Sequence, residues 1–361
     1  MLSRYTVFLV ACALPFLFTS LLAPQTANQL DFWLMWLLAM AVVGLPILFA
    51  EFALSARSGL SVWQGMQKLT RDADAKIIWR VFAGLSVLVG LFAAVSTTTR
   101  IATGVDAYLP QMNLGVPTAA LSAGLMVVAL ILSLLKSRLL PVGLVFILLG
   151  ALISLFDGGA SSTIATPVMT HVSLKEWGQA VTLALLSVGI GTGLYWFSGL
   201  SASVAVYEHK KSLSGFILPI WLTQIIFGGL ALLTSAAFIT PLSFAVSSLG
   251  MLLFAGFLLH YVASQLIARF GLMMGAGLTV VLSLILSLIP IKAVVIILTI
   301  ISFSAVTILS IFSGFIMKIS HLRKTLNFKT EGRYNIWRVC VRILVPLALA
   351  AALVGLVLSW F

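Results

Sequence analysis

Long runs of apolar residues, separated by short polar segments, occupy most of the chain. A transmembrane helix needs about 20 consecutive apolar residues to cross the hydrocarbon core of a bilayer. Eleven segments have about this length, so we expect eleven membrane-spanning helices. They lie at residues 5–23, 31–56, 77–109, 117–135, 139–156, 177–206, 213–238, 242–268, 272–290, 293–317 and 335–360.

Composition and charge agree with a polytopic membrane protein. Hydrophobic residues make up 61% of the chain and charged residues only 8%, against roughly 25% charged residues in a soluble domain. Lysine and arginine favour the cytoplasmic side of a membrane. Of the 21 lysines and arginines, 18 are expected on the same side as the N-terminus, and only Arg100, Lys175 and Lys292 on the other side. We therefore expect a multi-pass protein of a bacterial inner (plasma) membrane, with a cytoplasmic N-terminus and a non-cytoplasmic C-terminus.

This charge split also bears on two alternatives. The net charge of +12 is explained by topology, so the lipid bilayer is an expected partner and nucleic acid is not. The first apolar run could instead be a signal peptide cleaved near Leu22 and Ala23. Removing that run would disturb the charge count, which favours keeping it as a span.

The eleven runs divide into two halves with an odd number of spans each. We expect one transmembrane domain, 1–361, with a first repeat at 1–156, a second repeat at 175–319 and an extra helix at 335–360. Five plus five spans give the two repeats opposite orientations, which is an inverted repeat. The predicted fold class is therefore an all-α polytopic membrane protein with a 5+5 inverted repeat and an eleventh helix.

The first span of each repeat contains helix breakers. Pro15 interrupts the first span, and Gly189, Gly191 and Gly193 alternate in the sixth. Backbone that leaves a helix at membrane depth must line a cavity or be buried in protein. We therefore expect helices one and six to be broken, with bare backbone brought to a ligand. The alternative is that the glycines serve close helix packing.

Four stretches resemble the neurotransmitter:sodium symporter family in its short eleven-helix bacterial form. They are VVGLPILFAEFALSARSG at 42–59, EWGQAVTLALLSVGIGTG at 176–193, FAGF at 254–257 and IWRVCVRILVPLALAAALVG at 336–355. The resemblance implies a leucine-transporter-type fold and a secondary active transporter of a small, amino-acid-like solute. Inverted repeats with discontinuous helices are characteristic of that fold.

The resemblance also implies binding residues. Ser187 falls on the family's helix-six serine, Gly189 and Gly191 fall on its unwound glycines, and Glu51 falls on its helix-two glutamate. A glutamate inside the membrane is costly, so it is usually paired or faces a cavity, and tying down unwound backbone would be a structural role for it. The full set of expected solute-binding residues is Pro15, Phe16, Thr19, Ser20, Ser96, Ser187, Gly189, Gly191 and Tyr195.

Departures from the family pattern argue against its sodium sites. The helix-one signature with its asparagine and arginine is missing, leaving Thr19 and Ser20 as the nearest polar groups. Leu258 and Leu259 stand where helix eight should supply threonine and serine, and His260 follows them. Sodium needs several oxygen ligands. These departures remove most of the side-chain oxygens of the two sodium sites that the family has. A proton carried by His260, with Glu51 as a second candidate for ion coupling, could replace sodium; a packing role for His260 is the alternative.

Two functions remain after the enzyme class is set aside. No catalytic dyad and no phosphate-binding loop occur, and Cys12 and Cys340 indicate neither a disulfide nor a metal site. We therefore expect no enzyme activity, no metal and no cofactor. The favoured function is a transporter for a small-molecule solute, proton-coupled or sodium-independent. The alternative is a degenerate homologue that no longer transports and acts as a partner or regulatory subunit of another membrane protein.

Overall fold

The structure is a computed structural model that describes residues 4–22, 29–109, 115–157, 169, 172–189, 191–196, 212–235 and 240–360. All regular elements in these ranges are helices. The part up to residue 157 contains α1 (Arg4–Leu22), α2 (Leu30–Ala39), α3 (Leu45–Ser58), α4 (Val62–Asp72), α5 (Val81–Tyr108), α6 (Thr118–Ser133) and α7 (Leu139–Asp157). The rest contains α8 (Leu174–Val188), α10 (Ser214–Ser235), α11 (Pro241–Phe270), α12 (Leu272–Ser287), α13 (Ile291–Ile311), α14 (Ile319–Leu326), α15 (Glu331–Val339) and α16 (Val345–Trp360).

Within the described residues, these helices follow the apolar runs closely. Seven helical stretches are long and apolar enough to cross a membrane, and three shorter apolar helices lie at Thr6–Thr19, Thr118–Ser133 and Leu272–Ser287. The sixth apolar run, 177–206, includes most of α8, which ends after 15 residues. Residues 197–206 of that run lie outside the described part. The all-α fold class is confirmed, whereas the count of eleven spans and the division into repeats stay predictions.

Two spans change their winding just before a proline. A π-helical turn, Met40–Gly44, joins α2 to α3 ahead of Pro46, and another, Cys340–Leu344, joins α15 to α16 ahead of Pro346. Proline lacks the amide that a continuous α-helix requires, and just before Pro46 the Leu45 amide bonds the Met40 carbonyl in the wider π pattern. Two indoles from other helices add bonds to carbonyls of this span. The indole of Trp221 donates to the Met40 carbonyl at 3.0 Å, and the indole of Trp337 donates to the Pro46 carbonyl at 2.9 Å.

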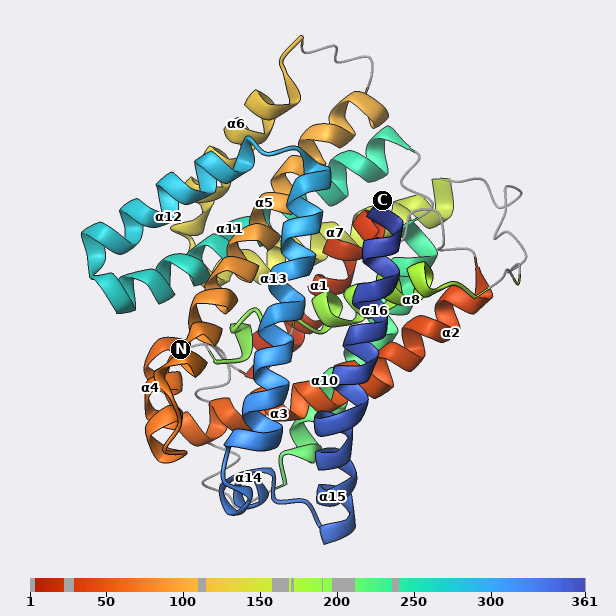
Figure 1. Ribbon diagram of the computed structural model, residues 1–361. Coiled ribbons are helices and arrows are strands. Elements are labelled where there is room, and N and C mark those ends of the chain that lie inside the picture. Colours follow the sequence, from red (N-terminus) through yellow and green to blue (C-terminus); the bar gives the residue numbers. More distant parts are fainter. Residues whose placement is uncertain are drawn as a thin grey trace.

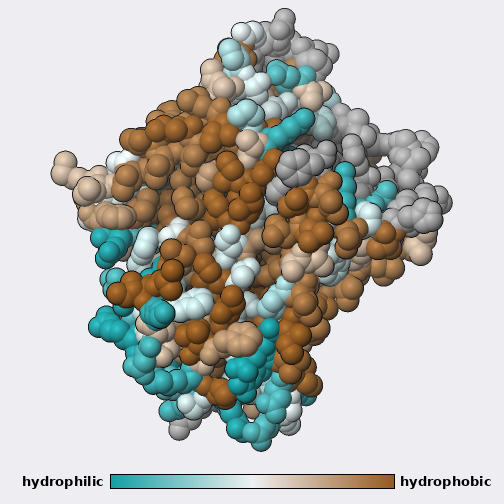
Figure 2. All heavy atoms as spheres, viewed as in Figure 1, coloured by the Kyte–Doolittle hydropathy of each residue, from teal (hydrophilic) through white to brown (hydrophobic). Residues whose placement is uncertain are grey.

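Within the bundle, α1 packs against α8, and α5 packs against α11 (Figure 1). Helix α1 contacts α8 and α10, while α5 contacts α11 and α13. Helix α11 runs against α7 at close range because Gly143 and Gly150 face Gly250 and Ser247 across the interface. Such small residues let membrane helices approach closely. Figure 2 shows a hydrophobic band above a hydrophilic end that carries α14 and α15.

The predicted break in the first span is wrong. Helix α1 continues through Pro15 from Arg4 to Leu22, and the hydroxyl of Thr19 donates to the Pro15 carbonyl at 2.7 Å. The physical reason lies in the sequence of α1, which contains no glycine. A single proline costs the helix one hydrogen bond, but leaving the helix also needs residues that readily adopt other backbone angles.

Candidate functional site

The backbone of α8 breaks sharply after Val188. Gly189, Gly191 and Gly193 have φ angles of +72°, +75° and +71°, in the left-handed region that residues with a Cβ rarely adopt. One turn of helix resumes at residues 194–196. This segment, which we call the α8 break (Gly189, Gly191 to Trp196), confirms that the sixth span is interrupted at its glycines.

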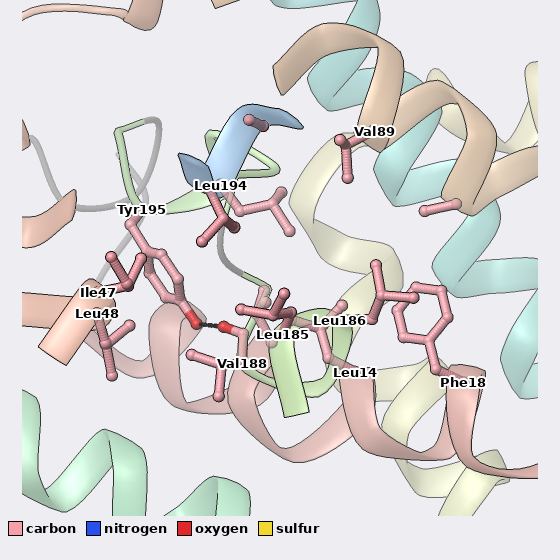
Figure 3. Packing of buried hydrophobic residues seen from close by; sticks show 14 of the residues in the cluster. Leu14, Phe18, Ile47, Leu48, Val89, Leu185, Leu186, Val188, Leu194 and Tyr195 are labelled. Carbon is pink, nitrogen blue, oxygen red and sulfur yellow. Dashed lines mark hydrogen bonds between the residues drawn. The ribbon is translucent and has the colours of Figure 1, made fainter. Parts of the chain in front are cut away.

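The carbonyl of Val188, the last residue of α8, accepts bonds from two side chains, and Figure 3 shows the bond from Tyr195. The Tyr195 hydroxyl donates to it, and Nε2 of Gln224 donates to it at 3.1 Å. The same Gln224 amide group also lies 2.8 Å from the Tyr195 hydroxyl. Because all three residues are buried, this network keeps a carbonyl that has left the helix from being unpaired in an apolar interior.

Glu51 on α3 holds the other side of the α8 break. Its Oε2 atom accepts a hydrogen bond from the Gly191 amide at 3.0 Å, and the Gly193 amide and the Trp196 indole also lie next to the carboxylate. Glu51 is fully buried. The Gly191 bond satisfies one carboxylate oxygen, whereas Oε1 has no hydrogen-bond partner within bonding distance among the described residues. Glu51 therefore connects α3 to the unwound backbone.

Three side chains from other helices fill the space beside the glycines. A Cβ added to Gly189 would lie 2.5 Å from Leu14 of α1, and one added to Gly191 would lie 3.1 Å from Ala305 of α13. The hydroxyl of Tyr261 on α11 lies directly against Gly193. Figure 3 shows Leu14 packed beside Leu185, Leu186 and Val188. The centre of the bundle is therefore closed by apolar side chains.

The expected solute-binding residues divide into those at the break and those turned away from it. Gly189, Gly191 and Tyr195 form the break, and the fully buried Ser187 hydroxyl one turn before Gly191 has no hydrogen-bond partner among the described residues. Phe16 contacts Phe227 of α10 with ring centres 6.5 Å apart.

Two of the expected hydroxyls are used within their own helices. Thr19 is bonded to the Pro15 carbonyl, and Ser96 on α5 donates to the Ala93 carbonyl at 2.9 Å. Such bonds satisfy a hydroxyl locally and leave less of it for a ligand. Ser20 belongs to α1, but its side chain lies outside the described residues.

The residue of α11 that reaches the α8 break is Tyr261, not the adjacent His260. Tyr261 is fully buried, whereas His260 is half-buried and lies within electrostatic range of Lys136, in the turn between α6 and α7. Adjacent helical residues point about 100° apart, which accounts for the difference. The sequence analysis missed both Tyr261 and Gln224. A polar amide side chain within the apolar α10 was the signal that could have identified Gln224.

The described residues do not fit the sodium sites of the resembling family. Leu258 and Leu259 are fully buried in α11 and offer no side-chain oxygen. The carbonyls of α1 are engaged in a continuous helix. No group of three histidine, cysteine, aspartate or glutamate side chains that could hold a metal occurs in the described part of the chain.

A cavity of about 220 Å³ lies toward the start of α8, beyond the break. Helices α1, α8, α13 and α16 form its walls. Its polar lining consists of Gln179 and Thr182 on α8 and Thr299 on α13, and the remaining lining residues are apolar: Leu21, Leu22, Val295, Ile296 and Leu356. No charged side chain lines it, so it suits a small molecule with a modest number of polar groups.

Two solved structures resemble the chain over almost its whole length. One is MhsT in complex with L-phenylalanine, with a TM-score of 0.72 and 16% identity over 98% of each chain. The other is Mhp1, a nucleobase-cation-symport-1 family transporter, in a closed conformation with bromovinylhydantoin bound. Its TM-score is 0.51, with 12% identity over 100% of this chain and 92% of that chain.

These likenesses define the class of fold. The chain has the leucine-transporter-type fold that MhsT and Mhp1 also have. No protein-family model matches the sequence, and no curated protein matches it. Because the sequence identities are low, function has to be argued from the residues of the site.

Proposed function

We propose that this protein is a secondary active transporter of a small, amino-acid-like solute. The observation that carries the proposal is the α8 break, where Gly189, Gly191 and Gly193 are left-handed and Glu51 accepts a hydrogen bond from Gly191. Discontinuous helices at the bilayer midplane form the solute sites of transporters with inverted repeats. Both structural neighbours were solved with a small molecule bound.

The chemistry of the cavity beyond the break indicates the solute class. Gln179, Thr182 and Thr299 provide hydrogen-bonding groups, and the other lining residues are apolar. Burying an unpaired charge is far more costly than burying a group that can be hydrogen-bonded. We infer an amphipathic solute whose side chain is uncharged. None of the solute-binding residues proposed from the sequence lines this cavity. We propose that Ser187, Gly189, Gly191 and Tyr195 contact the solute at the α8 break, toward the other end of α8.

Coupling to sodium is not part of the proposal. Leu258, Leu259 and the continuous α1 leave few oxygens for a sodium ion. We propose sodium-independent or proton-coupled transport, with His260 and Glu51 as the candidate proton carriers. Histidine titrates close to neutral pH, and Glu51 is linked to the unwound backbone by the Gly191 hydrogen bond.

Uptake into proteoliposomes tests the function and its coupling together. A panel of radiolabelled neutral amino acids is offered with sodium replaced by choline, with and without an inward proton gradient. We expect uptake of at least one solute without sodium, driven by the gradient in the native chain and lost in His260→Gln. Uptake that requires sodium, or gradient-driven uptake that survives in His260→Gln, would contradict the proposed coupling.

The proposed orientation places the N-terminus in the cytoplasm of a bacterium and the C-terminus outside. The 18-to-3 division of lysine and arginine supports this orientation. A reporter that is active only in the cytoplasm, fused after the last residue, should give no signal. The same reporter fused after Gly271, in the short turn between α11 and α12, should give a strong one.

A second candidate function is a non-transporting homologue that acts as a membrane-protein partner or regulatory subunit. The observation in its favour is the packing of Leu14 onto Gly189, together with the locally bonded hydroxyls of Thr19 and Ser96. Ligand binding to the folded state raises thermal stability by mass action. If no member of the solute panel raises the unfolding temperature or is taken up, this second function replaces the first.

A further inference from the structure

Four cations lie at the end of the molecule formed by α14 and α15, away from the α8 break. We call Lys324, Lys329, Arg333 and Arg338 the basic platform. They lie on α14, on the turn after it and on α15, at the hydrophilic end in Figure 2. Residues 318–342 contain seven lysines and arginines and a single glutamate.

The carboxylates near the basic platform already have other partners. Asp72 is paired with Arg57 at 3.2 Å, Asp74 with Lys318 at 2.8 Å, and Glu331 with Arg323 at 2.8 Å. The Lys318 ammonium lowers the pKa of the Asp74 carboxyl below its ordinary value. Within the described residues, no carboxylate at this end remains for the platform; Glu208 lies outside them. An external anion is therefore the natural counter-charge.

The helices that carry the basic platform are fixed to the bundle. The indole of Trp337 on α15 donates to the Pro46 carbonyl at 2.9 Å, and the Tyr334 hydroxyl donates to the Ile319 carbonyl at 3.4 Å. Leu322 and Leu326 of α14 are buried. Cations on anchored elements lose less conformational freedom when they bind an anion than cations on a free tail would.

Exposed apolar side chains surround the same cations. Phe315, Ile319, Ile336 and Val339 are between 44% and 67% exposed. A depression of about 740 Å³ lies on α14 and the turn after it, with Arg323 and Lys324 next to Ile319 and Phe328. Cations interleaved with exposed apolar groups are typical of protein surfaces at the boundary between headgroups and acyl chains.

We propose that the basic platform binds the headgroups of anionic phospholipids in the leaflet that it faces. Phospholipids supply both the negative charge that the platform lacks and the acyl surface that the apolar side chains need, which a soluble phosphate does not. Clusters of lysine and arginine next to a transmembrane helix attract anionic lipids in this way. This interaction is separate from solute transport and does not depend on it.

Thermal unfolding of the full chain in a neutral detergent tests the proposal. Short-chain phosphatidylglycerol is titrated in, with phosphatidylcholine of the same chain length and glycerol 3-phosphate as parallel arms. The test variant is Lys324→Gln/Lys329→Gln/Arg333→Gln, which removes cations without a carboxylate partner. The matched control is Lys175→Gln/Lys292→Gln, two exposed cations at the opposite end.

We expect phosphatidylglycerol alone to raise the unfolding temperature of the native chain and of the control. Its half-saturating concentration should rise about tenfold in the platform variant, a modest loss for three removed cations. High salt should weaken the effect in the native chain, so the result does not depend on how the variant folds. Equal stabilisation by phosphatidylcholine, full stabilisation by glycerol 3-phosphate, or an unchanged half-saturating concentration in the platform variant would overturn the proposal.

Discussion

Helices α1 and α8 contain the two breakers that the sequence places in matching positions, yet only α8 is broken. Pro15 lies inside a continuous α1, whereas Gly189, Gly191 and Gly193 all adopt positive φ angles. A proline removes one hydrogen bond, while a series of glycines lowers the cost of leaving the helix altogether. The comparison teaches that breaking a membrane helix requires both permissive residues and partners for the freed backbone.

The groups that hydrogen-bond the backbone at each breaker also differ between the two helices. Val188 at the end of α8 receives bonds from Tyr195 and Gln224, and Gly191 donates to Glu51. Within α1, the hydroxyl of Thr19 bonds the Pro15 carbonyl of the same helix. Distant residues therefore stabilise the irregular backbone of α8, and a local residue supports the regular backbone of α1.

The largest expected effect comes from filling the α8 break. Gly191→Leu combines a positive φ of +75° with a Cβ that would lie 3.1 Å from Ala305. Strain of this kind costs about 1–3 kcal/mol before any steric term. We expect the variant to insert into the membrane but to lose solute binding, measured as the solute-induced rise in unfolding temperature.

A matched control for this substitution is Gly124→Leu in α6, where an added Cβ meets no atom within 4 Å. It should leave both expression and solute binding unchanged. Solute binding retained in Gly191→Leu would mean that the glycines serve helix packing only.

The next largest effect should come from Glu51, which holds the break from α3. Glu51→Leu leaves the Gly191 amide without its acceptor, a loss of about 1–3 kcal/mol for a buried donor. Glu51→Gln keeps a carbonyl oxygen of the same reach and should lower the unfolding temperature much less. Equal losses in the two variants would show that the charge of Glu51, rather than its hydrogen bond, stabilises the break.

Removing the two donors to the Val188 carbonyl should produce a smaller and non-additive effect. Tyr195→Phe and Gln224→Leu each leave one donor in place, so each should cost about 1 kcal/mol. The double variant leaves the buried carbonyl unpaired and should lose more than the two single losses together. A double-mutant cycle on unfolding temperatures measures this coupling; strictly additive losses would contradict a shared role.

The smallest effect should come from Pro15 itself. Because α1 is already helical, Pro15→Ala supplies a missing amide without changing the path of the chain, and we expect a gain of about 1 kcal/mol or less. Solute binding should be preserved. A variant that is destabilised or no longer binds solute would show that the proline is part of the site after all.

The sequence predicted the helices well because hydrophobic length and period are local properties. It also predicted the break at Gly189 and Gly191, because several glycines close together in one span lower the cost of leaving the helix. It did not predict the continuous α1, because the prediction weighed Pro15 alone, whereas a proline in a helix without glycine removes one bond and leaves the helix continuous.

The partners of the site were harder to predict than its backbone. Gln224, Tyr261 and Leu14 reach the α8 break from α10, α11 and α1, and such contacts depend on how the helices pack. His260 was a reasonable candidate by residue type, but a rotation of one residue along α11 places Tyr261 at the break instead. The part of His260 in ion coupling stays a prediction.

Hydrogen exchange of backbone amides in the purified protein tests the difference between α1 and α8 most directly. A continuous α1 predicts slow exchange at the amides of residues 16–19, similar to the middle of α5. The break predicts faster exchange at Thr192, whose bond to the Gly189 carbonyl is long at 3.4 Å, than at Gly191 and Gly193, whose amides lie against the Glu51 carboxylate. A bound solute should slow the amides of the break and leave α1 unchanged. Fast exchange across residues 16–19, or slowing there on solute binding, would contradict the account.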